Sequence, residues 1–394
     1  MVARRGLEMV GDQPGAARCR LLGAAAFVLG AAGEVAEAHR LIATAIAEAE
    51  SLDDTRLLGQ LLNFNALIGL ASMAGREWAM VAERSAALLH DSGDLWEWVQ
   101  VVGWRGMARW CVGDTELVEE AVDAEATAER VGGLGAIAVI RMARAVNALS
   151  RRGDLEVFEA FARWYIDFSE RNDFPWKMVG ASWFGLVSFW RGQWDEARTH
   201  VAQSLEFERQ MRHPRTAWSI WSNAVMVKAY AGDGDVGALL DERASFLPEA
   251  GRRNSNGAWG LLLRTVEARV LLGQHEAAAS LYPLVLEALD TGTVIEFQSM
   301  ELLQKAAGTA AAAGSRWEVA EEHYRTAIRQ AEELPHQIAR PEVRRWYGRM
   351  LLDRDAAGDR ERARALLGQA ADIYEQLGMP RHLEIANEML KNAL

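Results

Sequence analysis

The sequence is poor in cysteine and in net positive charge. Its 394 residues include only two cysteines, Cys19 and Cys111, which is too few for a disulfide framework and favours a reducing, cytoplasmic setting. The formal net charge is −12. Duplex DNA is bound largely through Lys and Arg contacts to phosphate, and anionic membranes attract the same residues. We therefore predict no direct nucleic-acid partner and no membrane partner.

Motifs that mark catalysis or metal binding are also absent. The dipeptide Gly-Lys does not occur, so no phosphate-binding P-loop is present, and no Gly-x-Ser-x-Gly nucleophile elbow is found. No two of the eight histidines are four residues apart, as a helical zinc site would require. The acidic pair Asp53–Asp54 falls in an expected turn, where helix capping explains it. We predict no metal and no cofactor, although an active site assembled from distant segments would leave no such motif.

What the sequence does contain is a glycine that recurs at intervals of 38 to 44 residues. The nine positions are Gly33, Gly75, Gly113, Gly153, Gly192, Gly232, Gly273, Gly314 and Gly358. Residues seven positions before and five positions after each glycine are never charged, as expected for the buried faces of two packed helices. Alternating β-branched runs are nearly absent. A period of this length indicates a helical solenoid, because one hairpin cannot bury its own apolar face.

These patterns predict an all-α protein built as a right-handed superhelical solenoid of about nine antiparallel helix pairs. We expect one repeat domain over residues 1–394, with the end of a preceding helix in 1–13 and a capping helix in 380–394. The apolar stretch of residues 18–33 is interpreted as the first buried helix, not as a signal peptide. Pro283 lies inside an expected helix and should kink it.

The spacing and residue types resemble the tetratricopeptide repeat family. The stretch "FGLVSFWRGQWDEA" (residues 184–197) keeps the family's order of small residue, glycine and acidic residue, but the period exceeds the usual 34. The stretch "ERARALLGQAADIYEQLGMPRH" (361–382) is similar to the C-terminal repeat region of bacterial LuxR-type and adenylate-cyclase-associated signalling ATPases. The chain itself has no ATPase loop and no evident basic helix-turn-helix, so we interpret it as either an excised sensor region or a standalone relative.

One column of residues departs from the apolar pattern. Nine positions before the repeat glycines stand Ala24, Ala66, Trp104, Arg144, Trp183, Asn223, Arg264, Lys305 and Arg349, which we call the groove column. The resemblance places it on the concave face, together with neighbours that include Arg345, Glu267 and Glu301. Arg and Trp commonly anchor binding surfaces. We predict an open, solvated ligand-binding groove formed by Trp104, Arg144, Asn147, Trp183, Trp190, Asn223, Tyr230, Arg264 and Lys305.

The composition of this groove favours a binding or sensor module. Its ligand would be a peptide segment or an anionic, partly aromatic small molecule, and its binding would be relayed to a partner protein or a linked regulatory domain. Oligomers are compatible with the pattern. One alternative is an enzyme with a base such as Glu267 or Glu301 in the same groove, and another is a structural scaffold with an empty groove. Long Arg stems and gap-filling Trp residues would also occur on such a scaffold.

Overall fold

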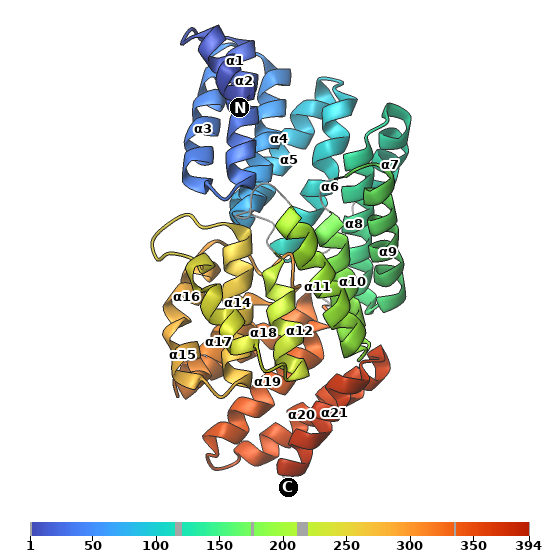
Figure 1. Ribbon diagram of the computed structural model, residues 1–394, viewed down its shortest axis with the longest axis vertical. Coiled ribbons are helices and arrows are strands. Elements are labelled where there is room, and N and C mark those ends of the chain that lie inside the picture. The colour runs from blue at the N-terminus through green and yellow to red at the C-terminus, as the bar shows by residue number, and fades with distance from the viewer. Residues whose placement is uncertain (1, 115–119, 175–176, 211–219, 335, 394) are drawn as a thin grey trace.

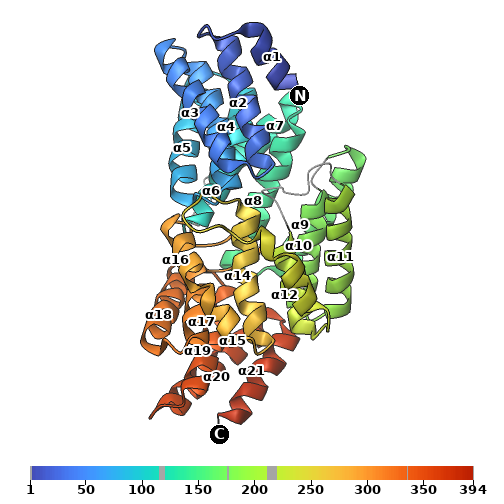
Figure 2. The same cartoon turned by 60° about the vertical axis from the view of Figure 1, so that its left-hand side comes forward.

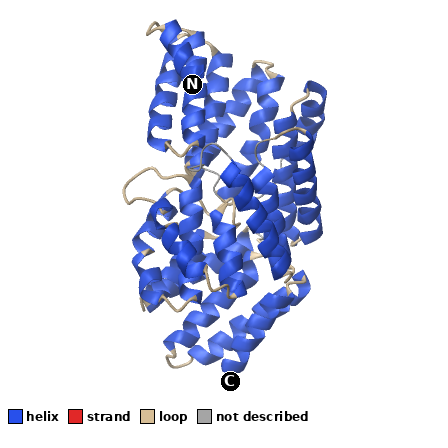
Figure 3. Cartoon of the chain, viewed as in Figure 1, coloured by secondary structure: helices blue, strands red, loops and turns tan. Residues whose placement is uncertain are grey.

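The computed structural model describes residues 2–114, 120–174, 177–210, 220–334 and 336–393. Over these residues the chain is helical (Figure 3), with an isolated β-bridge between Ile295 and Leu302. The all-α class predicted from the sequence is therefore confirmed. The two termini lie near opposite ends of the long axis (Figure 1). Within the described residues, no helix combines the length and apolar character needed to cross a membrane.

The described helices pack in nine consecutive pairs, which we number as hairpins one to nine. Helix α1 (Val2–Val10) precedes them and α21 (Pro380–Asn392) follows. The pairs are α2 (Ala16–Ala31) with α3 (Val35–Ser51), α4 (Thr55–Ala71) with α5 (Gly75–Asp91), α6 (Leu95–Cys111) with α7 (Glu120–Val131), α8 (Leu134–Arg152) with α9 (Leu155–Arg171), α10 (Lys177–Trp190) with α11 (Trp194–Gln210), α12 (Trp221–Ala231) with α13 (Val236–Glu242), α14 (Asn256–Leu271) with α15 (His275–Ser280) and α16 (Tyr282–Asp290), α17 (Leu303–Ala313) with α18 (Trp317–Glu333), and α19 (Ala339–Arg354) with α20 (Asp359–Leu377).

The two helices of a hairpin differ in burial. In the fifth hairpin every residue of α10 from Met178 to Trp190 is buried, whereas α11 buries only five of its 17 residues. The same contrast holds between α14 or α17 and the helices that follow them. The first helices thus form an inner layer and the second helices an outer layer (Figure 2). We call the surface of the inner layer that carries the groove column the inner face.

Local chemistry accounts for the turns. Asp54 caps α4, because its carboxylate accepts a hydrogen bond of 2.9 Å from the backbone N–H of Leu57, which confirms the capping interpretation of the acidic pair. Gly153 ends α8 with a left-handed φ of 66°, a conformation that glycine adopts without strain. Helices α15 and α16 are separated at Leu281, two residues before Pro283, so the helix is interrupted where the sequence predicts a kink.

The array packs against itself, because hairpin turns early in the chain contact hairpins far later in it. A Cβ added to Gly113 would lie 2.9 Å from Leu334, and one added to Gly153 would lie 2.2 Å from Leu377. The backbone N–H of Gln337 donates a 2.7 Å hydrogen bond to the carbonyl of Ser150. Some repeat glycines therefore serve two purposes. They end a helix, and because they lack a side chain they also let a later part of the array approach closely.

One connection departs from the repeat. Between α16 and α17 the chain runs irregularly through residues 291–302, which we call the strap. The hydroxyl of Thr293 donates to the carbonyl of Met73 (2.8 Å), and the backbone N–H groups of Val294 and Ile295 donate to the carbonyl of Cys111 (2.8 and 3.0 Å). The strap thereby ties the second and third hairpins to the eighth.

Candidate functional site: the inner face

The strap lies along the middle of the inner face and is held there by side chains of the groove column. Asn223 donates to the carbonyl of Gln298 (3.2 Å), and Arg264 donates to the carbonyl of Ser299 (3.0 Å). The ring of Phe297 packs edge-on against Trp183, with 5.6 Å between ring centroids. His336, between the eighth and ninth hairpins, contacts the carbonyl of Met300 (3.1 Å). The column therefore binds a loop of its own chain.

The strap also has internal hydrogen bonds that fix its shape. The buried carboxylate of Glu296 accepts hydrogen bonds from the backbone N–H groups of Gln298 (2.9 Å) and Ser299 (2.7 Å) and from the Ser299 hydroxyl (2.6 Å). The backbone N–H of Glu296 donates to the carbonyl of Glu301 (2.8 Å). Burial raises the pKa of Glu296, and these donors offset that effect only in part. The strap is therefore a preformed structural loop.

This arrangement corrects one expectation about the predicted site. Seven of the nine predicted residues are buried, whereas the sequence predicted that they line an open groove; they are Trp104, Asn147, Trp183, Trp190, Asn223, Arg264 and Lys305. The expectation of an open groove is wrong for these seven. For Trp183, Asn223 and Arg264 the physical reason is the strap, a segment that carries no repeat signal and lies far away in sequence. Their role in ligand binding stays a prediction.

The other two predicted residues have different surroundings. Arg144 has half of its side chain exposed and pairs with Glu125 at 2.5 Å. Tyr230 is half-buried, and its hydroxyl donates to Glu267 (2.5 Å). Tyr230, Trp190, Arg264 and Lys305 line one small cavity of about 30 Å³. The structure thus brings four of the nine predicted residues together, and Arg144 is not among them.

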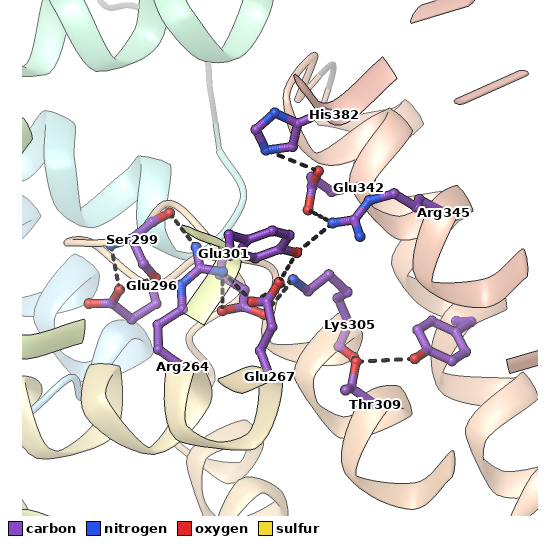
Figure 4. Close-up of polar contacts among 12 residues, drawn as sticks. Arg264, Glu267, Glu296, Ser299, Glu301, Lys305, Thr309, Glu342, Arg345 and His382 are labelled. Atoms are coloured by element: carbon purple, nitrogen blue, oxygen red, sulfur yellow. Dashed lines mark hydrogen bonds and ion pairs between the residues drawn. The ribbon is translucent and has the colours of Figure 1, made fainter. Parts of the chain in front are cut away.

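Beside this cavity lies a buried ion-pair network (Figure 4). Arg264 pairs with Glu267 (2.5 Å) and Glu301 (3.2 Å), and Lys305 pairs with the same two carboxylates (3.2 and 2.9 Å). Burial acts to raise the pKa of Glu267, but Lys305 and Arg264 outweigh it and hold that pKa well below its usual range. Burial raises the pKa of Glu301, and the two cations offset it only in part.

The network continues toward the C-terminus. Arg345 pairs with Glu342 (2.8 Å) and donates to the hydroxyl of Tyr230 (2.6 Å). Although burial opposes it, Arg345 lowers the pKa of Glu342 to about 2. His382 lies 4.0 Å from Glu342. Burial of the His382 imidazole lowers the pKa of His382 to about 4. His382 is therefore neutral at pH 7.

The chemistry of the network is that of a neutral structural cluster. Three cationic side chains face three carboxylates, and removing one partner of such a network leaves an uncompensated buried charge. The adjoining cavity has room for a water molecule but not for a substrate. Glu267 and Glu301, the bases considered for the enzyme alternative, are both ion-paired. Among the described residues, no cluster of three or more His, Cys, Asp or Glu is arranged to hold a metal ion.

Beyond the strap, an open cleft of about 400 Å³ lies where the ends of α14, α17 and α19 meet the beginnings of α15 and α18, and Arg349 of the groove column lines it. Its polar lining includes Arg349, Asp353 and His275, and its aromatic lining consists of Trp317, Tyr324 and Trp346. Trp346 separates the cleft from the ion-pair network, because the ammonium of Lys305 lies 5.6 Å from its ring. The cleft is large enough for a small ligand.

Sequence reasoning chose none of these cleft residues. Arg349 was the last member of the groove column, and that column was the signal that could have found the site. The positions of Trp346 and Asp353 belong to none of the periodic columns that the sequence shows. Arg349 could be chosen over Trp183 only from the structure, which shows the part of the groove column that the strap leaves open.

Comparisons with known proteins identify no family for this chain. No family model matches the sequence, and no curated protein matches it. Among solved structures, the chain is similar to a Rap protein complexed with competence and sporulation factor. That structure is 13% identical over 85% of this chain and 97% of the other, with a TM-score of 0.46. The fold is therefore assigned from the helices of this chain and not from this similarity.

Proposed function

We propose that this chain is a binding module of a regulatory system. It captures a peptide segment or an anionic, partly aromatic small molecule on its inner face and relays that binding to a partner protein or a linked domain. The observation that carries the proposal is the open cleft, where the groove column reaches solvent at Arg349. Aromatic residues and an arginine around a concave space are typical of binding sites.

The structure supports this function better than the two alternatives. The enzyme alternative needs a carboxylate free to take a proton from a substrate. Glu267 and Glu301 are ion-paired, and Glu296 is held by three donors of its own loop. The scaffold alternative is favoured by the strap, which fills the centre of the inner face. It does not account for the cleft beside Trp346 and Arg349.

A binding screen with a matched pair of variants tests the proposal. The full chain is dialysed against two defined libraries, one of tri- to pentapeptides and one of small aromatic carboxylic acids, and retained compounds are identified by mass spectrometry. Arg349→Met removes the cleft guanidinium and keeps an unbranched side chain. Arg329→Met makes the same change on the exposed face of α18 and serves as the control.

The expected result is that compounds from at least one library are retained by the wild type and by Arg329→Met and are lost from Arg349→Met. Retention that is equal in all three proteins would place binding elsewhere and refute the proposed site. If no member of either library is retained, the binding-module proposal fails and the scaffold alternative takes its place.

A further inference from the structure

The cleft contains hydrogen-bond donors that its own residues leave underused. The guanidinium of Arg349 lies 3.4 Å from the carbonyl of Val270 and 3.7 Å from the carboxylate of Asp353, and both distances exceed those of strong charge-assisted hydrogen bonds. The side chain of Arg349 is 28% exposed. Its guanidinium can therefore take up an external oxygen anion.

A second donor is the indole N–H of Trp346, which has no hydrogen-bond partner among the described residues. Trp346 lines the cleft, but it is 2% exposed and its indole nitrogen is itself buried. The cations of Lys305, Arg345 and Arg349 lie 5.2 to 5.6 Å from its ring. Arg349 is therefore the donor that a ligand in the cleft reaches directly, and Trp346 packs against its guanidinium.

The cleft also contains a carboxylate that opposes the binding of an anion. Asp353 has half of its side chain exposed and is the carboxylate nearest to Arg349. Burial raises the pKa of Asp353, while Arg349 and His275 lower it. An anion bound at Arg349 would be repelled by this carboxylate, so removal of its charge should strengthen anion binding.

The size and surroundings of the cleft limit what else the ligand contains. Trp317 is partly exposed in the cleft and supplies a flat aromatic wall, whereas Tyr324 and Trp346 are nearly fully buried in its lining. Such a wall favours a planar group over a branched one. An extended peptide cannot continue along the inner face, because the strap occupies the neighbouring stretch and contacts Asn223 and Arg264 there. Small molecules are therefore favoured over long peptides.

We propose that the ligand of the cleft is a small aromatic acid, with its carboxylate on the guanidinium of Arg349 and its ring against the aromatic wall. This inference rests on the proposed function and selects one of its two ligand classes. It makes the cleft a site for a small molecule of the size of an aryl carboxylate, and not for an extended peptide.

Titration calorimetry of the full chain with phenylacetate, its neutral analogue phenylacetamide and acetate tests the inference. Phenylacetate should bind at least about tenfold more tightly than either analogue, since only it has both the charge and the ring. Arg349→Met should weaken phenylacetate binding at least about tenfold, whereas Asp353→Asn should strengthen it. Arg329→Met should leave the affinity unchanged, and circular dichroism melts check that all variants are folded.

Several outcomes would overturn the inference. They are equal affinity for phenylacetamide, unchanged affinity in Arg349→Met, weaker binding in Asp353→Asn, or no binding of phenylacetate at all. These failures differ from a failure of the proposed function. If the dialysis screen retains peptides in an Arg349-dependent manner while phenylacetate does not bind, the binding module stands and the aromatic-acid class is wrong.

Discussion

At the scale of single residues, Trp183 is a core residue of the inner face. It is fully buried, and its ring contacts those of Phe158, Phe161 and Phe297. Trp183→Ala should lower the free energy of unfolding by about 3–5 kcal/mol, the usual cost of deleting a large buried aromatic side chain. Urea unfolding measures this loss. Val146→Asp, which places an unpaired charge at another fully buried position, should destabilise the protein at least as much. A loss of less than about 1 kcal/mol for Trp183→Ala would contradict the packing of the strap against this ring.

His336, which contacts the strap, should make the stability of the fold depend on pH. Its Nε2 lies 3.1 Å from the carbonyl of Met300, and its Nδ1 accepts from the backbone N–H of Ala339 (3.4 Å), so the neutral imidazole fits both partners. Burial lowers the pKa of His336 to about 4, whereas its usual value is 6.5. The unfolded chain therefore binds more protons between these values, and stability should fall as the pH drops from 6.5 to about 4.

Urea unfolding across this pH range checks the role of His336. His336→Gln keeps a donor for the Met300 carbonyl but cannot titrate, so its unfolding free energy should depend less steeply on pH than that of the wild type. Some slope should persist, because burial lowers the pKa of His382 to about 4 as well. Identical slopes in the two proteins would show that His336 is not buried in its neutral form.

At the scale of elements, two glycines within helices make a matched comparison. Gly75 begins α5, and a Cβ there would lie 2.6 Å from the hydroxyl oxygen of Thr293 and 3.1 Å from its Cα. Gly368 lies within α20, where a Cβ would meet nothing within 4 Å. Thermal melts should show that Gly75→Ala destabilises the protein by about 1–3 kcal/mol, the usual range for overpacking. Gly368→Ala should stabilise it by up to about 1 kcal/mol. Stabilisation by both changes would show that the strap does not press on α5.

The repeat explains how much of these elements could be predicted from the sequence. Periodic glycines and uncharged columns report local packing between adjacent helices, so the nine hairpins and the break near Pro283 could be predicted. The strap could not, because its contacts with Met73, Cys111 and Asn223 join residues far apart in sequence and follow no period. The groove column contains Arg349, which is partly exposed, whereas for the same reason the exposure predicted for Trp183 and Asn223 is wrong.

At the scale of the whole molecule, the array is a self-packed structure in which later hairpins contact earlier turns. A linear solenoid exposes its concave face along its full length. Here the strap fills the middle of that face and the described cleft remains open near its C-terminal end. This packing of later hairpins on earlier turns places Gly113 and Gly153 next to Leu334 and Leu377. We infer that ligand binding belongs to the open stretch and structural support to the filled one.

Hydrogen exchange of the full chain, measured by mass spectrometry with and without the library of aromatic acids, tests this claim most directly. We predict slow exchange of the strap in both samples, because the backbone N–H groups of Val294, Ile295 and Glu296 are hydrogen-bonded inside the array. We predict that added ligand slows exchange at the ends of α14, α17 and α19 in the wild type but not in Arg349→Met. Fast exchange of the strap, or ligand protection centred on α10 and α12 instead of the cleft, would contradict the account.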